Sequence, residues 1–267
     1  MGDRDYVLGT HDEEVARLGL QHQVWRPQVL DAFRRVGIGP GATVVDVGAG
    51  PGFASTDLAE IVGPDGRVIA LERSRRFLDA LEERARGLGL ANIEASERDV
   101  AESGFGEGFA DACWCRWLLS FVADPRRTVG HIASALKPGG RAVFHEYADY
   151  RAWRTLPPDP DLERFRTLVI QSWRDSGGEP DIGLQLPGWL ALEGLEIVEV
   201  RPLIHIVRKG DPVWEWPASF MASGAGRLAE LGYVEAGEAE RLATALDRLP
   251  QDSWMTTPLV LEVIARR

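Results

Sequence analysis

The chain has 267 residues, 45% of them hydrophobic and 27% charged, enough to bury the core of one large domain or two small ones. Its 30 basic and 41 acidic residues give a formal charge of -11, which argues against a protein that tracks nucleic-acid phosphates or docks on anionic lipid. No apolar run is long enough for a membrane span, and the first ten residues hold no apolar signal core. Cys113 and Cys115 are poorly placed to bridge each other, so we expect a reduced, cytoplasmic globular protein.

The segment before residue 40 is predicted to be helical. Thr10 and Glu13 have the spacing of a capping box, which marks the start of a helix. Apolar side chains then recur near helical spacing until Gly37 stops the pattern: Val15, Leu18, Trp25, Val29, Phe33 and Val36. We expect two helices here, divided near residues 20–22.

From residue 43 onward, short β-branched runs alternate with helical patterns. Strands are predicted over residues 43–47, 67–71, 92–98, 109–115 and 141–147, and again near 195–207 and 259–265. Helices are predicted over 53–62 and after Ser74, a favourable N-cap residue. This alternation predicts an α/β fold with a doubly wound, mostly parallel seven-stranded sheet and helices on both faces.

Two helical segments interrupt the pattern in the second half of the chain. We expect residues 1–149 to form the N-terminal helices and the ligand-binding core, and residues 150–193 to form a helical insertion. Residues 194–267 would supply the last strands, with a second helical insertion at about 211–250. Six of the nine tryptophans fall in this half, so the two insertions are predicted to form one cap that contains part of an apolar substrate pocket.

A glycine-rich turn follows the first strand. Asp46 lies inside that strand, and Gly48, Gly50 and Gly52 follow it before the next helix, so backbone N–H groups and the helix N-terminus face a bound ligand. The turn lacks the dinucleotide spacing, because Phe53 stands where a third glycine is needed, and no Gly-Lys-Ser/Thr follows it. A buried aspartate needs a partner, which is either a ligand ammonium or a neighbouring donor.

Acidic residues also follow the next two strands. Glu72 ends the second strand, where a carboxylate can accept hydrogen bonds from both hydroxyls of a ribose; its alternative is an ordinary surface position. Asp99 follows the third strand and can accept a hydrogen bond from an adenine amine, or be structural. No histidine or further cysteine lies at ligand spacing from Cys113 and Cys115, so no metal site is expected.

Five motifs in order resemble those of a class I S-adenosylmethionine-dependent methyltransferase. They cover roughly residues 40–147 and read VVDVGAGPG, IALERS, RDV, FADACWCRWLLSFVADP and LKPGGRAVFHEY. The opening helices are also similar to those of bacterial small-molecule methyltransferases. The resemblance implies a Rossmann-like methyltransferase fold, S-adenosyl-L-methionine as cofactor with S-adenosyl-L-homocysteine as product, and methylation of a small molecule at O, N or C.

The resemblance also implies roles for individual residues. Those expected to line the cofactor site are Asp46, Gly48, Ala49, Gly50, Gly52 and Phe53 in the glycine turn, Glu72 at the ribose, Arg73, Asp99 and Val100 at the adenine, and Cys115, Arg116 and Trp117 after the fourth strand. Tyr6, Gln21 and Trp25 are expected to close over the cofactor; the alternative is plain helix packing.

Methyl transfer is an in-line displacement, so the main task of the protein is to align donor and acceptor. A base assists when the acceptor must lose a proton, and His145 at the end of the fifth strand is the leading candidate. The alternative for His145 is a structural hydrogen bond. Glu146 is a second catalytic candidate, and His11 or His22 could reach the site from the N-terminal helices.

The acceptor is expected to be an aromatic or polyketide-like metabolite. Cys115-Arg116 replaces the acid expected for aminopropyl transfer, and the fourth strand lacks the Asn/Asp-Pro-Pro-aromatic motif of many amine methyltransferases. Neither nucleic acid nor a membrane is an expected partner, and an apolar cap is compatible with a homodimer. The alternatives are a catalytically silent cofactor-binding protein and an enzyme that methylates a macromolecule.

Overall fold

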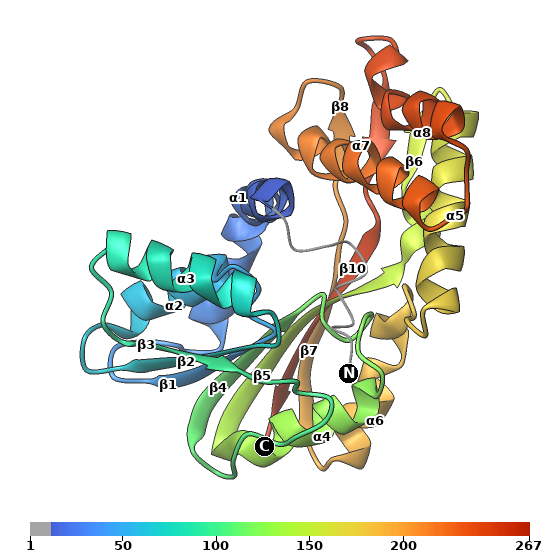
Figure 1. Ribbon diagram of the computed structural model, residues 1–267. Helices are drawn as coiled ribbons and strands as arrows, with labels where there is room; N and C mark the ends of the chain where they lie inside the picture. The colour runs from blue at the N-terminus through green and yellow to red at the C-terminus, as the bar shows by residue number, and fades with distance from the viewer. Residues whose placement is uncertain (1–11) are drawn as a thin grey trace.

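The computed structural model describes residues 12–267, which are built around a seven-stranded sheet (Figure 1). The strand order is β3-β2-β1-β4-β5-β10-β7. The strands are β1 (Thr43–Val47), β2 (Arg67–Glu72), β3 (Ile93–Glu97), β4 (Ala110–Arg116), β5 (Leu136–Asp149), β7 (Glu196–Leu203) and β10 (Leu259–Arg266). Strands β1 to β5 pair in parallel, and β10 runs antiparallel to both of its neighbours. The predicted doubly wound, mostly parallel sheet is therefore confirmed.

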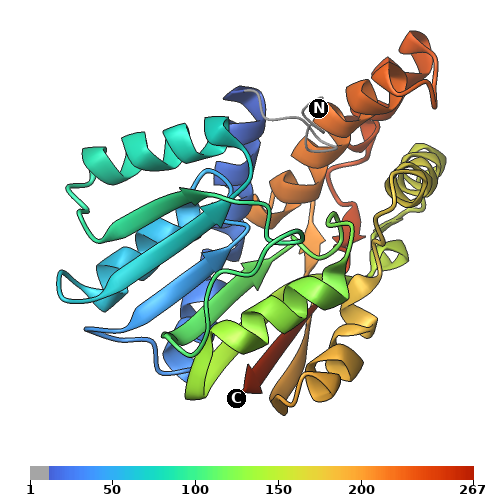
Figure 2. The ribbon, with the colours of Figure 1, turned by 60° about the horizontal axis from the view of Figure 1, so that its bottom comes forward.

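Helices cover both faces of this sheet (Figure 2). They are α1 (Asp12–Arg35), α2 (Phe53–Val62), α3 (Arg75–Gly87), α4 (Pro125–Ala135) and α6 (Leu186–Leu192). Successive side chains of a strand point to opposite faces. Trp114 of β4 therefore packs with Phe33 of α1, whereas its neighbour Cys113 belongs to the cluster that includes Ile132 of α4. Both clusters are apolar, as expected for buried parallel strands.

Helix α1 is continuous, and the predicted division near residues 20–22 is wrong. Trp25, Val29 and Phe33 are fully buried at helical spacing, and Pro27 is accommodated inside the helix. The side chains of Gln21 and His22, where the division was predicted, are buried and hydrogen-bonded. Thr10 of the predicted capping box lies outside the described residues.

A second lobe sits over the carboxyl ends of β4 and β5 (Figure 1). It consists of α5 (Pro160–Asp175), α7 (Glu215–Glu230), α8 (Ala236–Ala243), β6 (Arg154–Leu156), β8 (Ile206–Arg208) and β9 (Trp254–Thr256). Short 3-10 helices are η1 (Tyr150–Ala152), η2 (Ile182–Leu184), η3 (Pro212–Trp214) and η4 (Leu246–Arg248). We call this lobe, from η1 to α5 and from β8 to β9, the cap.

The two chain segments of the cap pack on each other. β9 pairs with both β6 and β8, and the ring of Phe165 in α5 lies 5.7 Å from that of Phe220 in α7. The strand expected over 195–207 is divided between β7 in the large sheet and β8 in the small one. The break is at His205, whose backbone exchanges hydrogen bonds with Thr257.

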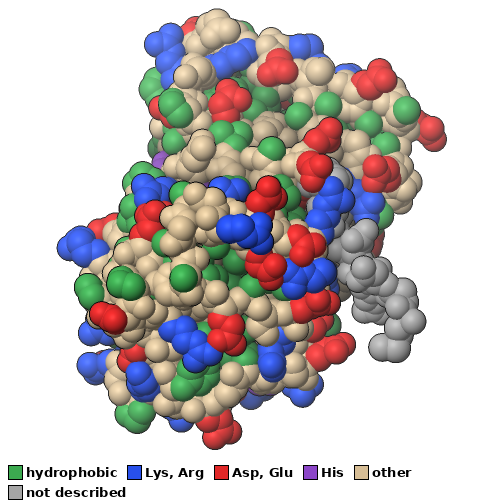
Figure 3. Space-filling model, turned by 60° about the vertical axis from the view of Figure 1, so that its left-hand side comes forward, with side chains coloured by type: hydrophobic (Ala, Val, Ile, Leu, Met, Phe, Trp, Pro, Cys, Tyr) green, Lys and Arg blue, Asp and Glu red, His purple; other side chains and the backbone are tan. Residues whose placement is uncertain are grey.

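The surface carries charges of both signs. Figure 3 shows acidic and basic side chains interspersed on the face that it presents. Within residues 12–267, none of the helices combines the length and apolarity needed to span a bilayer.

Candidate functional site

The glycine turn after β1 has the left-handed backbone that its sequence requires. Gly48, Gly50 and Gly52 have φ angles of 76°, 54° and 78°, a region that other residues rarely adopt. The backbone nitrogens of Gly48 and Ala49 both lie 2.9 Å from the carbonyl oxygen of Leu71, which ties the turn to β2.

The two sides of this turn differ. A Cβ atom at Gly52 would lie 2.3 Å from Cγ of Leu81, so this glycine permits the packing of α3 against the turn. A Cβ atom at Gly50 would meet nothing within 4 Å. The turn is therefore closed by α3 at one end and open at Gly50, where a ligand can approach the backbone.

Glu72 lies beside that open glycine. Its Oε2 accepts a hydrogen bond from the backbone nitrogen of Gly50 (3.0 Å), and its Oε1 accepts one from that of Ser74 (2.9 Å). The two residues meet because β1 and β2 are parallel neighbours, with Val47 opposite Leu71. Burial raises the pKa of Glu72.

Asp46 is buried with a protein partner. Its Oδ2 accepts a hydrogen bond of 2.6 Å from the hydroxyl of Ser55 on α2. Burial raises the pKa of Asp46 to about 6, although the Ser55 hydroxyl and the charge of Arg116 oppose the shift. Asp46 was expected to have either a ligand ammonium or a neighbouring donor as its partner. The Ser55 hydroxyl is such a donor, and it satisfies one of the two carboxylate oxygens.

The predicted adenine residues follow β2 and β3. The backbone nitrogen of Arg98 donates to the Glu72 carbonyl (2.9 Å), which places Asp99 beside the end of β2. Asp99 accepts a hydrogen bond from the backbone nitrogen of Ala101 (2.9 Å). Val100 is buried and Arg73 is exposed.

The carboxyl end of β4 and the turn after it lie next to the glycine turn: Cys115 is opposite Val47, and Leu118 packs against Gly48. Cys115 is buried, and its Sγ lies 3.9 Å from Oε1 of Glu146. Nη2 of Arg116 lies 3.2 Å from Nδ1 of His22, whereas its Nη1 is buried without a partner in the described chain. Burial lowers the pKa of Arg116 to about 10, so the side chain remains charged at neutral pH.

The structure separates the predicted lid residues. Trp25 is fully buried between the rings of Trp117 (5.4 Å) and Trp216 (4.9 Å), so it belongs to the core and is not a movable lid.

Phe53, the last predicted cofactor residue of the glycine turn, packs within the protein. Its ring stacks on His22 at 5.8 Å, with the Arg84 guanidinium 3.8 Å from its centre. Tyr6 and His11 lie outside the described residues.

The two catalytic candidates on β5 are buried and hydrogen-bonded within the protein. His145 and Glu146 are both 0% exposed, and neither lines a described pocket. Nε2 of His145 lies 2.9 Å from Oε2 of Glu262, and burial lowers the pKa of this histidine. Glu146 accepts hydrogen bonds from the backbone nitrogens of Leu118 and Leu119. The structural alternative to catalysis therefore fits both side chains better.

Both ring nitrogens of His22 also contact other side chains of the protein. Its Nε2 lies 3.0 Å from Asp57, its Nδ1 faces Arg116, and burial lowers its pKa. His131 and His205 also make contacts within the protein. Nδ1 of His131 lies 2.9 Å from the Val100 carbonyl oxygen, and the His205 ring packs on Trp25 at 5.3 Å.

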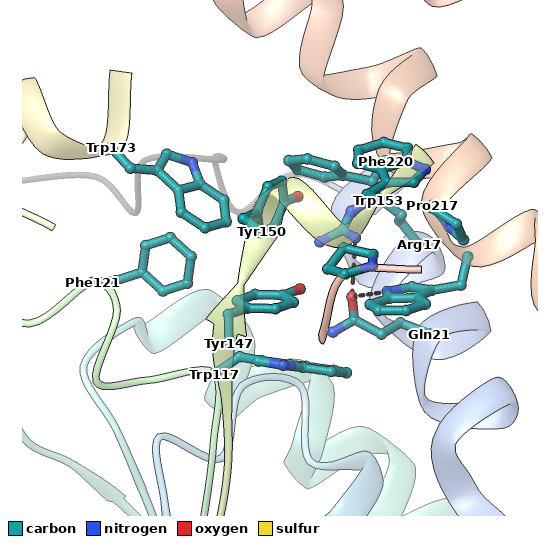
Figure 4. A pocket seen from close by; sticks show the side chains of 12 residues that line it. Arg17, Gln21, Trp117, Phe121, Tyr147, Tyr150, Trp153, Trp173, Pro217 and Phe220 are labelled. Atoms are coloured by element: carbon teal, nitrogen blue, oxygen red, sulfur yellow. Dashed lines mark hydrogen bonds between the residues drawn. The ribbon is translucent and has the colours of Figure 1, made fainter. Parts of the chain in front are cut away.

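An aromatic pocket lies between the core and the cap (Figure 4). The pocket is narrow and partly open to solvent. Its lining residues are Arg17, Gln21, Trp117, Phe121, Tyr147, Tyr150, Trp153, Trp173, Trp216, Pro217, Phe220 and Pro258. We call this the aromatic pocket.

Sequence reasoning found only part of this pocket. Of the six tryptophans in the second half of the chain, Trp153, Trp173 and Trp216 line the aromatic pocket, and Gln21 does so from α1. Sequence reasoning missed Tyr147 and Tyr150, although aromatic residues at the carboxyl end of β5 stand where ligands bind in such sheets. Trp117 belongs both to the turn after β4 and to the pocket, so it joins the two parts of the site.

Comparison with known proteins agrees with this geometry. Residues 44–140 match the family model described as a methyltransferase domain. The chain is 26% identical over 228 residues to an uncharacterized 37.1 kDa protein in a transposon of Streptomyces fradiae, covering 85% of this chain and 63% of that protein. It is 31% identical over 126 residues to the demethylmenaquinone methyltransferase of Lactococcus lactis, covering 47% and 49%. The chain thus spans about half to three-fifths of these two relatives.

Solved structures share the fold at low sequence identity. A putative methyltransferase from Bacillus halodurans superposes with a TM-score of 0.61 at 15% identity, covering 89% of this chain and 97% of that one. Geranyl diphosphate C-methyltransferase from Streptomyces coelicolor gives 0.59 at 18% identity, covering 92% and 77%. Residues 44–140 are therefore similar to a methyltransferase domain, and the chain shares the Rossmann-like fold of these structures.

Proposed function

We propose that this protein is an S-adenosyl-L-methionine-dependent methyltransferase that acts on a small, aromatic or polyketide-like molecule. One observation carries the proposal: Leu118, next to Trp117 in the turn after β4, packs against Gly48 of the glycine turn, so the site beside Glu72 and the aromatic pocket meet there. The sheet edge at Glu72, which can bind a nucleoside, thus lies next to the apolar pocket that can bind the acceptor. Transfer of a group between two bound molecules requires such neighbouring sites.

The residues at the strand ends fit the cofactor. Glu72 offers two carboxylate oxygens for the ribose hydroxyls, with Asp99 and Val100 next along the edge for the adenine. Asp46 can attract the ammonium group, and the unpartnered Nη1 of Arg116 can bind the carboxylate of the methionine part. When bound, the sulfonium supplies an activated methyl group, and the product is S-adenosyl-L-homocysteine.

The remaining chemistry is alignment and exclusion of water. The aromatic pocket has walls that hold a flat acceptor against the turn at Trp117. Because His145 and Glu146 are buried in other contacts, we assign neither of them the removal of a proton. The charge of -11 favours a small molecule over nucleic acid, and we place the protein in the cytoplasm.

Names of similar proteins support a small-molecule acceptor without identifying it. Relatives are named demethylmenaquinone methyltransferases, and the Streptomyces coelicolor structure holds geranyl-S-thiolodiphosphate and S-adenosyl-L-homocysteine. A structure with the same fold is named a [4+2]-cyclase, so the fold alone does not establish methyl transfer. This leaves a cofactor-binding protein without methylation as the competing function.

The test is a calorimetric titration with S-adenosyl-L-methionine and S-adenosyl-L-homocysteine. We expect micromolar binding by the natural protein and at least a tenfold loss in Glu72→Gln, which keeps the size of the side chain but removes its charge. Glu83→Gln, on the exposed side of α3, is the matched control and should bind as the natural protein does. Absence of binding by the folded natural protein would refute the proposal; binding without methylation of any acceptor would favour the competing function.

A further inference from the structure

The aromatic pocket contains three polar groups that form no hydrogen bond within the described chain. They are the amide nitrogen of Gln21, the hydroxyl of Tyr147 and the indole nitrogen of Trp117, which come from α1, from β5 and from the turn after β4. Of the three, only the Trp117 nitrogen is a buried atom without a partner, which is rare in native proteins. The Gln21 and Tyr147 groups keep some exposed surface, so a ligand in the pocket can reach them.

The orientation of the Gln21 amide is determined by its other contacts. Its Oε1 accepts hydrogen bonds from Nε1 of Trp216 (2.9 Å) and Nη1 of Arg17 (3.3 Å). Both partners can only donate, so the atom that faces them must be the oxygen. The NH2 group therefore points the other way, toward the side of the pocket where Tyr147 lies (Figure 4).

All three unpaired groups are suited to donate. The Gln21 amide nitrogen and the Trp117 indole nitrogen have no acceptor capacity. Burial raises the pKa of Tyr147 above its ordinary value, so its hydroxyl keeps its proton. No carboxylate is among the residues that line the pocket in the described chain, and Arg17 is the one charged residue there. The pocket thus combines flat apolar walls with a set of hydrogen-bond donors.

We infer that the methyl acceptor is a hydroxyarene whose oxygen accepts hydrogen bonds from Gln21 and Tyr147. This inference rests on the proposed function. The same donors stabilise the phenolate and lower the pKa of the bound phenol, so its proton can pass to water without a basic side chain. The phenolate oxygen, or the ring carbon beside it, then forms the bond to the methyl carbon; when carbon attacks, that carbon also loses its hydrogen as a proton to water, which restores the aromatic ring. The carbon–sulfur bond breaks with its electron pair going to sulfur, and a methylated arene and the thioether product result. An arylamine lacks the acceptor oxygen and is disfavoured.

The experiment compares 1-naphthol with 1-naphthylamine by calorimetry, in the presence of S-adenosyl-L-homocysteine. The two probes have the same ring system, but the naphthol oxygen accepts hydrogen bonds and the amine chiefly donates at neutral pH. We expect the natural protein to bind 1-naphthol at least tenfold more tightly. Tyr147→Phe keeps the ring that stacks on Trp117 and should weaken 1-naphthol binding about three- to tenfold.

Gln21→Glu is the sharper variant, because it keeps the oxygen that faces Trp216 and Arg17 and removes both N–H donors. We expect it to weaken 1-naphthol binding at least tenfold. Gln23→Glu is the matched control: the same substitution on the same helix, at an exposed position outside the pocket. It should leave the affinity unchanged, and circular dichroism establishes that each variant is folded.

The outcomes separate this inference from the proposed function. Cofactor binding together with a preference for 1-naphthol that Gln21→Glu abolishes supports both. Cofactor binding with no binding of 1-naphthol, or with equal binding of 1-naphthylamine, overturns the inference and leaves the proposed function intact. If the cofactor itself does not bind the natural protein, the proposed function fails, and the inference that rests on it fails as well.

Discussion

Glu146 accepts a hydrogen bond of 2.9 Å from the backbone nitrogen of Leu118, and the same oxygen accepts a second one from Leu119. These bonds fix the turn that begins with Trp117, which has a φ angle of 50° and is the one non-glycine residue with positive φ in the described chain. The Trp117 ring stacks on Tyr147 and Trp216. A buried carboxylate on β5 thus positions the boundary between the glycine turn and the aromatic pocket.

The protonation of Glu146 should make stability depend on pH. Burial raises its pKa to about 8, so the folded protein holds this proton more tightly than the unfolded chain does. Its contribution is fully present below the pKa of the unfolded chain, near 4.3, and is lost as the pH rises through 8. We expect Glu146→Gln, which mimics the protonated form, to gain stability relative to the natural protein by on the order of 2–4 kcal/mol between pH 5 and pH 8.5.

Urea denaturation of both proteins at several pH values measures this difference. Other buried groups titrate in the same range, but they are common to the two proteins and largely cancel when the curves are subtracted. Parallel curves over the whole range would mean that Glu146 keeps the same protonation state in the folded and unfolded chains.

His145 should act as a structural anchor. It is buried against Glu262, which also pairs with Arg35. His145→Phe keeps a ring but leaves that carboxylate without one buried partner, and should lower the free energy of unfolding by about 2–3 kcal/mol. His145→Gln keeps a donor and should cost less.

Turnover distinguishes an anchor from a base. Removal of a general base costs about 10²–10⁴-fold in rate, whereas we expect both His145 variants to stay within tenfold of the natural protein under folding conditions. A loss of a hundredfold or more in both folded variants, with a shifted pH–rate profile, would reinstate His145 as the base. The comparison uses any acceptor that the natural protein methylates.

The sequence was sufficient for features that depend on near neighbours. Strand periodicity predicted the sheet, and the glycine spacing predicted the turn. Even the contact between Gly50 and Glu72, 22 residues apart, could be expected because a βαβ unit places consecutive strand ends side by side. These features need only local patterns and the parallel geometry of the sheet.

The parts that could not be predicted depend on distant pairings. The burial of His145 requires Glu262, 117 residues later on an antiparallel strand whose neighbours the sequence does not specify. The aromatic pocket requires Gln21 of α1 to meet Trp216 of α7, 195 residues away. A polar residue on a helix is expected to face solvent unless its distant partner is known.

Gly50 should matter for ligand binding more than for folding. Gly50→Ala introduces strain at a φ of 54°, and its Cβ points into open space at the ligand-facing side of the turn. Gly41→Ala is the matched control, since it has a φ of 81°, also has nothing within 4 Å, and lies before β1. Each should cost about 1 kcal/mol of stability. Only Gly50→Ala should weaken S-adenosyl-L-methionine binding tenfold or more; equal affinities in the two variants would place the ligand elsewhere.

Trp216 should hold the cap to the core. It is buried, it donates to Gln21 of α1, and it stacks on Trp117, so it connects α7 to two elements of the core. Trp216→Phe keeps an aromatic ring but removes the donor and part of the packed surface, which should cost about 1–3 kcal/mol. The local consequence should be faster amide hydrogen exchange in α7 while α2 stays protected, because the lost contacts belong to the interface between cap and core.

Hydrogen exchange followed by mass spectrometry measures this effect. Trp254→Phe on β9 is the control, because that side chain is 47% exposed and its substitution should change stability by less than about 0.5 kcal/mol. If α7 and α2 exchange faster by the same factor in Trp216→Phe, cap and core unfold as one cooperative unit. The cap would then have no separate opening motion, and acceptor entry would have to occur through the solvent-open side of the aromatic pocket.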